Sequence, residues 1–264
     1  MPSVYHDVDS VYKENNNEWI AFTVNNIGKT FQGCGGEAPK WAALLLDGIH
    51  ARSMTTLNRR VGLDRENIVI VEHDKDSFNT LKSNHPDCNI VFDQMQKFVR
   101  DESFPENEFN VVFFDWMCTI RGNKAEGSPL DALSDYLKRT RLPFVVVAQT
   151  FCLRGEHVGP GAPYQEAKDR VCTEVTEAAT VNGYQPLWTS YFESIYTREG
   201  GRTAMFFSSI VLAQTPTETS PRYIWDFFNR NQLQLRNRYV NYCVLYGTSL
   251  TQSKVSRYTY RCGQ

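Results

Sequence analysis

Four carboxylates follow four short apolar runs in the first half of the chain. Asp47 comes after ALLL, Glu72 ends IVIVE, Asp93 follows NIVF and Asp115 follows VVFF. Successive acids are 21 to 25 residues apart, which is about one strand-and-helix unit each time. A single acid at such a place commonly caps the following helix. Four in phase instead predict a row of acceptors for hydroxyl or amine hydrogens along one edge of a sheet.

The segment after the first run, LDGIHARSMTT, contains a single glycine, Gly48. A turn that brings backbone against a pyrophosphate needs the glycines of GxGxxG, and the chain also lacks GxxxxGK[ST]. We therefore do not expect NAD, FAD or ATP. Gly48 and the N–H groups of a helix that starts near Ser53 still predict a ligand close to this turn.

The second and third acids are placed to hold an adenosine. An acid about one unit downstream of the first turn can accept both ribose hydroxyls, and Glu72 occupies that place. Asp93 is placed to accept the exocyclic amine of adenine. The positions expected to contact the nucleoside are Glu72, His73, Asp93 and Gln94, with Phe92 or Met95 against the ring. The adenosine half of a cofactor is thereby accounted for without phosphates.

Continuous apolar runs bounded by turn residues are typical of buried parallel strands. Amphipathic stretches between the runs indicate helices, and YQEAKDRVCTEVTEAATVNG predicts a longer helix closed by Gly183. Two β-rich runs around REGGR predict an antiparallel hairpin over 186–214. Right-handed crossovers then give an α/β fold: a Rossmann-like, mostly parallel sheet with antiparallel last strands, helices on both faces and a small C-terminal extension. The expected parallel strands are 42–48, 67–74, 89–93, 109–115 and 142–151.

The order of these elements resembles the class I S-adenosylmethionine-dependent methyltransferases, a Rossmann-like superfamily whose sheet ends in antiparallel sixth and seventh strands. The resemblance spans about 41–214 and is carried by ALLLDG, IVIVEHD, IVFD and VVFFDW. The family's first loop is usually glycine-rich, as in ExGxGxG, and LLLDGIHARSMTT stands in its place, which indicates a divergent or virus-like member. The resemblance implies S-adenosyl-L-methionine as cofactor, with its methionine portion held by Asp47, Gly48 and His50.

The fourth strand end, FFDWMC, is expected to carry the chemistry on the methyl acceptor. Family members that methylate base amines show [DNS]PP[YFW] here, which supplies an acidic acceptor and an aromatic platform for a flipped base. Both prolines are absent, yet Asp115 could orient an amine or accept a proton, and Trp116 could stack on a ring, with Met117 beside the substrate. The alternative is that Trp116 belongs to the core and Asp115 caps a helix. A Lys-Asp-Lys-Glu set for ribose 2′-O methylation cannot be assigned by spacing alone.

Two further segments bear on the acceptor. The loop LRGEHVGPGAP after the fifth strand lies on the same edge and offers Arg154 and His157 as substrate-binding candidates. The stretch 216–264 carries seven Lys or Arg against two acids, interleaved with nine aromatic residues. Basic groups neutralise phosphates and aromatic rings stack on bases, so this stretch predicts a surface for RNA or DNA. An aromatic mini-core with a solvated basic exterior explains the same composition equally well.

The chain divides into three expected parts. Residues 1–40 are expected to form a loose N-terminal arm and a glycine-rich loop, 41–215 the methyltransferase-like domain, and 216–264 the basic aromatic extension. A nucleic-acid base is the expected methyl acceptor. A methyltransferase of a small molecule or protein, and a non-catalytic methyltransferase-like scaffold subunit, are the alternatives.

Composition limits the expected cellular location and the expected partners of the protein. The formal net charge is −2, so no global field points to a polyanion or a membrane. No apolar run reaches the roughly 18 residues of a bilayer span, and the first residues do not resemble a secretory signal. Seven cysteines without CxxC and five histidines without HxxxH predict free thiols and no metal site. We therefore expect an intracellular protein, cytoplasmic or nuclear, that has no membrane partner.

Overall fold

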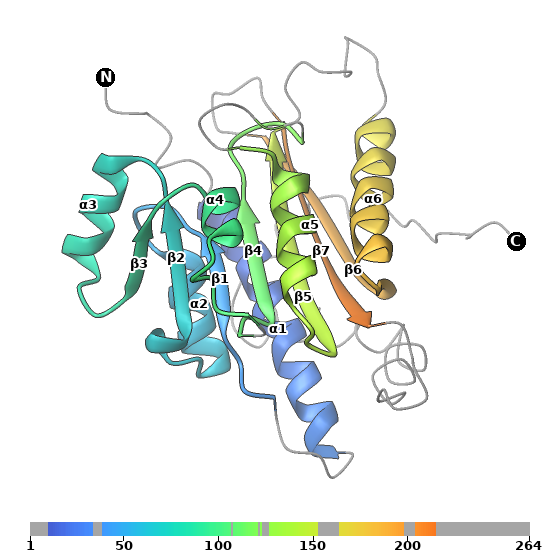
Figure 1. Cartoon of the computed structure of the whole chain (residues 1–264), viewed down its shortest axis with the longest axis horizontal. Coiled ribbons are helices and arrows are strands. Elements are labelled where there is room, and N and C mark those ends of the chain that lie inside the picture. The colour runs from blue at the N-terminus through green and yellow to red at the C-terminus, as the bar shows by residue number, and fades with distance from the viewer. Residues whose placement is uncertain are drawn as a thin grey trace, which may run out of the picture.

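The computed structural model describes residues 10–33, 39–106, 108–120, 122, 127–152, 164–197 and 204–214. These residues form a seven-stranded sheet with helices against it (Figure 1). None of the helices in these ranges combines the length and apolar character that a bilayer crossing requires. The elements are α1 (Ser10–Gly33), β1 (Ala43–Leu46), α2 (Arg52–Val61), η1 (Arg65–Asn67), β2 (Ile68–Glu72), α3 (Lys75–Asn84), β3 (Asn89–Phe92), α4 (Met95–Arg100), β4 (Val111–Asp115), α5 (Pro129–Arg139), β5 (Phe144–Cys152), α6 (Tyr164–Val181), β6 (Tyr184–Thr197) and β7 (Ala204–Gln214).

The sheet confirms the expected Rossmann-like architecture. Its strand order is β3-β2-β1-β4-β5-β7-β6. The first five strands run parallel to one another, while β7 runs antiparallel to both β5 and β6. Each expected parallel strand is present, with its ends within two residues of the predicted ones. Gly183 ends the helical segment before β6 with a φ of 80°, as its position after the amphipathic stretch predicted.

The order of the strands reverses between β1 and β4. Strand β1 pairs with β2 on one side and with β4 on the other, so the chain leaves β1 in one direction and returns to the opposite side. Loops that leave two such strands diverge, and a crevice opens at their carboxyl ends. Asp47 follows β1 and Asp115 ends β4, so this topology brings both acids to the same crevice.

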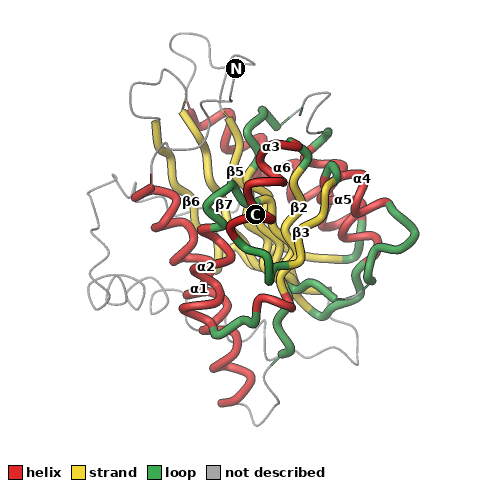
Figure 2. Tube along the Cα trace, turned by 90° about the vertical axis from the view of Figure 1, so that its left-hand side faces the viewer, coloured by secondary structure: helices red, strands yellow, loops and turns green. Residues whose placement is uncertain are grey.

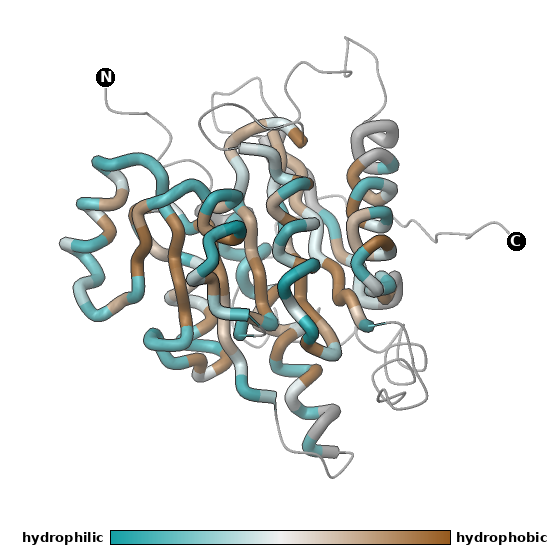
Figure 3. Tube along the Cα trace, in the orientation of Figure 1, coloured by the Kyte–Doolittle hydropathy of each residue, from teal (hydrophilic) through white to brown (hydrophobic). Residues whose placement is uncertain are grey.

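Two core clusters lie on the two faces of the sheet. Successive strand residues point to opposite faces. Leu45 and Phe113 therefore join α1 and α2 on one face, whereas Leu44 and Phe114 join α4, α5 and α6 on the other. Figure 2 shows α1 and α2 on one side of the strands and α4 and α5 on the other. The hydropathy colours in Figure 3 follow this layering, with apolar strands between helices whose outer sides are polar.

The segment before β1 forms helix α1, so the expectation of a loose N-terminal arm was wrong there. Trp19 and Ile20 of this helix belong to the core cluster that lines its face of the sheet. The helix also buries the consecutive polar residues Asn16, Asn17 and Glu18. A helix that packs on a sheet is recognised in a sequence by apolar residues on one side. Here polar residues occupy buried positions, so this apolar pattern is interrupted and the sequence does not predict the helix.

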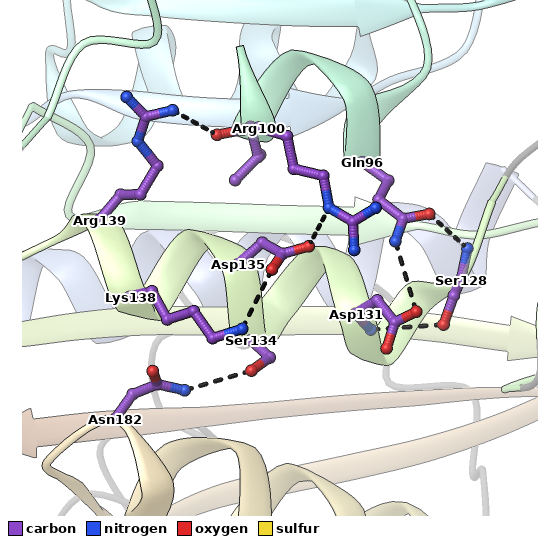
Figure 4. A network of polar contacts seen from close by, with 10 residues as sticks. Gln96, Arg100, Ser128, Asp131, Ser134, Asp135, Lys138, Arg139 and Asn182 are labelled. Carbon is purple, nitrogen blue, oxygen red and sulfur yellow. Dashed lines mark hydrogen bonds and ion pairs between the residues drawn. The ribbon is translucent and has the colours of Figure 1, made fainter. Parts of the chain in front are cut away.

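Ion pairs and hydrogen bonds connect the helices of the opposite face (Figure 4). Arg100 of α4 donates from Nε to Asp135 of α5 at 2.6 Å, and Lys138 pairs with the same carboxylate at 3.3 Å. Asn182, just after α6, donates to Ser134 Oγ at 3.3 Å. Exposed pairs of this kind contribute little to stability, so the buried apolar cluster beneath them holds the layer together.

Candidate functional site

A cavity opens at the carboxyl ends of β1 and β4, where the strand order reverses. The non-atom space at this place, open solvent included, is ≈ 550 Å³. The loop after β1 and the start of α2 form one wall, α1 forms another, and β4 and β5 contribute side chains from the sheet. The lining residues are Lys13, Asn16, Asn17, Asp47, Gly48, Ile49, His50, Ala51, Arg52, Ser53, Phe113, Asp115 and Thr150.

Asp47 lines this cavity and caps the start of α2. Its Oδ2 accepts a hydrogen bond from the Met54 N–H at 3.0 Å, and its Oδ1 accepts one from the Ser53 hydroxyl at 3.2 Å. Burial raises the pKa of Asp47 to about 6; the charge of Asp115 adds to this rise, while the Met54 N–H and Lys13 oppose it. The loop after β1 is thus hydrogen-bonded to the first turn of α2 through a carboxylate whose ionisation is disfavoured by burial.

The left-handed residue of the loop is Ala51, with φ 44° and ψ 46°, and Gly48 does not have a positive φ. The turn is closed by a hydrogen bond from the Ala51 N–H to the Gly48 carbonyl at 2.8 Å. A Cβ built on Gly48 would meet no atom within 4 Å. The fold therefore does not need the conformational freedom of Gly48, and a Cβ at this position would stand in open space next to the cavity lining. His50 is exposed beside it.

Asp115 is paired with a lysine that the sequence analysis did not single out. Lys13 Nζ, from α1, lies 2.7 Å from Asp115 Oδ2, and the two side chains are 28% and 10% exposed. These residues are 102 positions apart in the chain. The signal that could have found Lys13 is weak, because a lone lysine in a polar stretch is typical of a solvated surface. Only the packing of α1 over the end of β4 brings the pair together.

Two acceptor oxygens at the cavity lack a hydrogen-bond partner within the described part of the chain. They are Oδ1 of Asp115 and Oδ1 of Asn17, and each has less than 1 Å² of accessible surface. Asp115 and Asn17 both line the cavity. Buried acceptors are normally satisfied, so unpaired ones at a cavity indicate a ligand that brings donors. Together with Asp47, these groups offer acceptors to a ligand that carries N–H donors, while Lys13 and Arg52 line the same cavity as cations.

The expected nucleoside-binding residues lie at the ends of β2 and β3, and none of them is among the residues that line the cavity. Glu72 accepts a hydrogen bond from the Asp74 N–H at 2.7 Å, and His73 Nδ1 lies 3.5 Å from the same carboxylate oxygen. Burial is the main cause that raises the pKa of Glu72, and the Asp74 N–H and His73 oppose it. Asp93 N donates to the Glu72 carbonyl at 3.1 Å, which ties the two strand ends together. Gln94 follows directly and precedes α4.

Of the two residues expected against the adenine ring, Phe92 is exposed and Met95 is not. Phe92 is 51% exposed, and its ring lies 5.2 Å from that of Phe78. Met95 is 1% exposed within the core cluster of α4 and α5. Phe92 is therefore available for stacking on a planar ligand, whereas Met95 packs in the core between the sheet and its helices.

The aromatic residue after β4 lies in the core. Trp116 is 1% exposed and packs in the cluster with Phe114, with ring centroids 5.7 Å apart. Of the two interpretations of Trp116, the structure agrees with the core residue. A buried ring offers no face on which a flipped base could stack. Met117 packs, half-buried, against the opposite core cluster. Arg154 and His157, together with 216–264, lie outside the described residues.

Within the described ranges, no group of three or more His, Cys, Asp or Glu side chains is arranged to hold a metal ion.

No family model matches the chain, and no curated protein matches it either. The comparisons with solved structures include M. jannaschii TYW2 in complex with AdoMet, with a TM-score of 0.49 and 11% identity over 81% of this chain and 80% of that chain. They also include the O-methyltransferase from Bacillus cereus in complex with SAH, with a TM-score of 0.48 and 15% identity over 78% and 83%.

A SAM-dependent methyltransferase from Aquifex aeolicus gives a TM-score of 0.40 at 15% identity over 74% of this chain and 92% of that chain. The fold follows from the sheet of this chain. Its first five strands are parallel, the order of the strands reverses between β1 and β4, and β7 lies antiparallel between β5 and β6. By this strand order and these directions, the chain has the Rossmann-like fold expected of the class I S-adenosylmethionine-dependent methyltransferases.

Proposed function

We propose that this protein is an S-adenosylmethionine-dependent methyltransferase. The observation that carries the proposal is the cavity where the strand order reverses, with unpaired acceptor oxygens on Asp115 and Asn17. A ligand for this place must supply donors or positive charge. S-adenosylmethionine has both, an ammonium group and a sulfonium, and it has no phosphate that would require a glycine-rich turn.

Each of the other site residues is assigned to one part of the cofactor. Glu72, at the end of β2, would accept the ribose hydroxyls, and Asp93 with Gln94 at the end of β3 would face the adenine. The exposed ring of Phe92 would stack on the base. His50 and Gly48 would border the methionine portion, where Gly48 leaves room for close approach. When bound, the cofactor supplies a methyl group activated by its positive sulfur.

A nucleic acid is the proposed acceptor, on the strength of the basic and aromatic composition of 216–264. For an amine of a base, Asp115 would accept the amine hydrogens, and the burial of Trp116 removes the expected stacking platform from this arrangement. The contact of Lys13 with Asp115 favours a second candidate, a ribose hydroxyl, because the Asp115 carboxylate could accept the hydroxyl proton while the Lys13 ammonium stabilises the oxygen from which it leaves.

The cofactor is tested by calorimetric titration of the protein with S-adenosylmethionine and, in parallel, with NAD. We expect binding of the first and none of the second. Glu72→Ala should weaken binding of S-adenosylmethionine by about 100-fold, because two charge-assisted hydrogen bonds to the ribose are lost. An affinity for S-adenosylmethionine that survives this substitution would move the adenosine away from the end of β2.

Gly48→Ala separates the fold from the site. The substitution should leave the midpoint of thermal unfolding unchanged, because a Cβ at Gly48 meets no atom within 4 Å. The affinity for S-adenosylmethionine should fall by about tenfold or more, since the added methyl group occupies space at the ligand and steric overlap is costly. Differential scanning fluorimetry and calorimetric titration of the same preparation measure both quantities. A lower unfolding midpoint with unchanged affinity would contradict this assignment.

The acceptor is tested by transfer of labelled methyl from S-adenosylmethionine to RNA, to DNA of the same sequence, and to the same RNA already methylated at every ribose 2′ oxygen. Transfer to all three indicates a base, and transfer to the unmodified RNA alone indicates the ribose hydroxyl. Cofactor binding without transfer to nucleic acid would leave the small-molecule or protein methyltransferase and the non-catalytic scaffold. Incubation with free nucleosides and with peptides then distinguishes those two.

A further inference from the structure

Helix α1 is fastened to α2 by a buried carboxylate. The Glu18 side chain is fully buried, and its oxygens accept hydrogen bonds from Arg60 Nε at 2.8 and 3.1 Å. Arg59 donates to the same side chain from a second position at 3.2 Å. A second tie runs from the Asn25 amide to the Arg60 carbonyl at 2.9 Å. Glu18 and Asn25 thus both connect α1 to the last turn of α2.

Both helices that this contact joins reach the cavity, α1 with its N-terminal half and α2 with its first turn. The first turn of α2 contains Ser53 and Met54, which bind the carboxylate of Asp47, and Arg60 lies at its other end. On α1, Lys13 is five residues before Glu18, or about 7.5 Å along the helix axis. The contact therefore connects the wall that carries Lys13 with the wall formed by the loop after β1.

A directional contact adds to what the apolar packing of α1 specifies. Apolar contacts can be exchanged when a helix rotates or slides, since the hydrophobic effect is not directional. A buried carboxylate has no such freedom, because losing its cationic partners leaves an uncompensated charge away from water. The position of Glu18 against Arg59 and Arg60 thus selects one register of α1. That register places Lys13 Nζ against Asp115 Oδ2.

We propose that Glu18 is a positioning residue, which sets the register of α1 against α2 and thereby holds Lys13 at Asp115. The inference rests on the proposed function only in treating this cavity as the reaction site. Its structural part concerns the placement of Lys13 and is measurable without cofactor or acceptor.

The test is the rate at which an N-hydroxysuccinimide ester acylates Lys13 in the full chain, read by peptide mass spectrometry. Lys40, which is exposed, serves as the internal reference. Glu18→Gln keeps the size of the side chain and removes its charge, and it should raise the ratio of Lys13 to Lys40 acylation by about tenfold. Glu18→Asp keeps the charge and should restore most of the protection. Asn25→Ala removes the weaker, neutral tie and should raise the ratio by a smaller factor.

Asp87→Asn is the control, since it removes an exposed carboxylate that pairs with an arginine, Arg65, and should leave the ratio unchanged. A ratio in Glu18→Gln equal to that of the unmodified protein, with the fold intact by circular dichroism, overturns the proposal. If Glu18→Gln does not fold, Arg60→Gln, which removes the closer cationic partner of Glu18, is measured in its place, and an unchanged ratio there overturns the proposal. Failure of S-adenosylmethionine to bind would refute the proposed function and leave the acylation result standing, so the two failures are distinguishable.

Discussion

Asp115→Asn is expected to lower the rate of methyl transfer by a factor of about 10³, within the range found for groups that move or orient a proton in the transition state. The substitution keeps the volume of the side chain and one oxygen at its end. It removes the negative charge that pairs with Lys13 at 2.7 Å, and with it the acceptor for the hydrogens of an amine or hydroxyl. The affinity for S-adenosylmethionine should change by less than about tenfold, because at most one hydrogen bond to the cofactor is weakened.

Single-turnover transfer and calorimetric titration measure the two effects separately. Asp135→Asn is a suitable control, because Asp135 also pairs with a cation, Arg100 at 2.6 Å, but on the face of the sheet away from the cavity. Lys13→Gln and the double variant complete a cycle. If Asp115 and Lys13 act as a unit, the double variant should be about as slow as the slower single variant. Turnover of Asp115→Asn close to that of the unmodified protein removes Asp115 from the reaction.

The second large effect is a pH dependence of stability that comes from Asp47. Burial raises its pKa from 3.8 to about 6. Between these two values the native state binds more protons at Asp47 than the unfolded state does, so the free energy of unfolding falls as the pH rises through this window. A shift of this size corresponds to about 3 kcal/mol, lost between pH 4 and pH 6 and constant above it.

Urea unfolding of the unmodified protein and of Asp47→Asn at pH 4, 5, 6 and 7 isolates this contribution. Glu72, whose pKa burial also raises, titrates in both proteins and cancels in the difference. The difference in unfolding free energy should shift in favour of Asp47→Asn by about 2.4 kcal/mol from pH 4 to pH 7, because the unfolded carboxyl is already partly ionised at pH 4. A difference that stays constant over this range would show that Asp47 is ionised as readily in the folded state as in the unfolded chain.

Much of the sheet and of its chemical edge is determined by the sequence alone. The apolar runs are continuous because parallel strands are covered on both faces, and this composition does not depend on which strands become neighbours. The acids at the run ends, Asp47, Glu72, Asp93 and Asp115, lie at the carboxyl edge because strand direction fixes that edge. Phe92 at the end of β3 is likewise exposed where the nucleoside was expected.

Tertiary structure decided which groups meet at this edge. Residue type and spacing could not distinguish a stacking Trp116 from a core one, because the answer depends on whether the face after β4 is covered, and it is. Lys13 reaches Asp115 from 102 residues away, through helix α1, whose Glu18 makes a buried contact with Arg60 of α2. Local sequence records neither contact, since each one pairs polar groups that are distant in the chain and would be solvated separately. The strand edge is thus a local property of the sequence, while the cavity beside it is a product of packing.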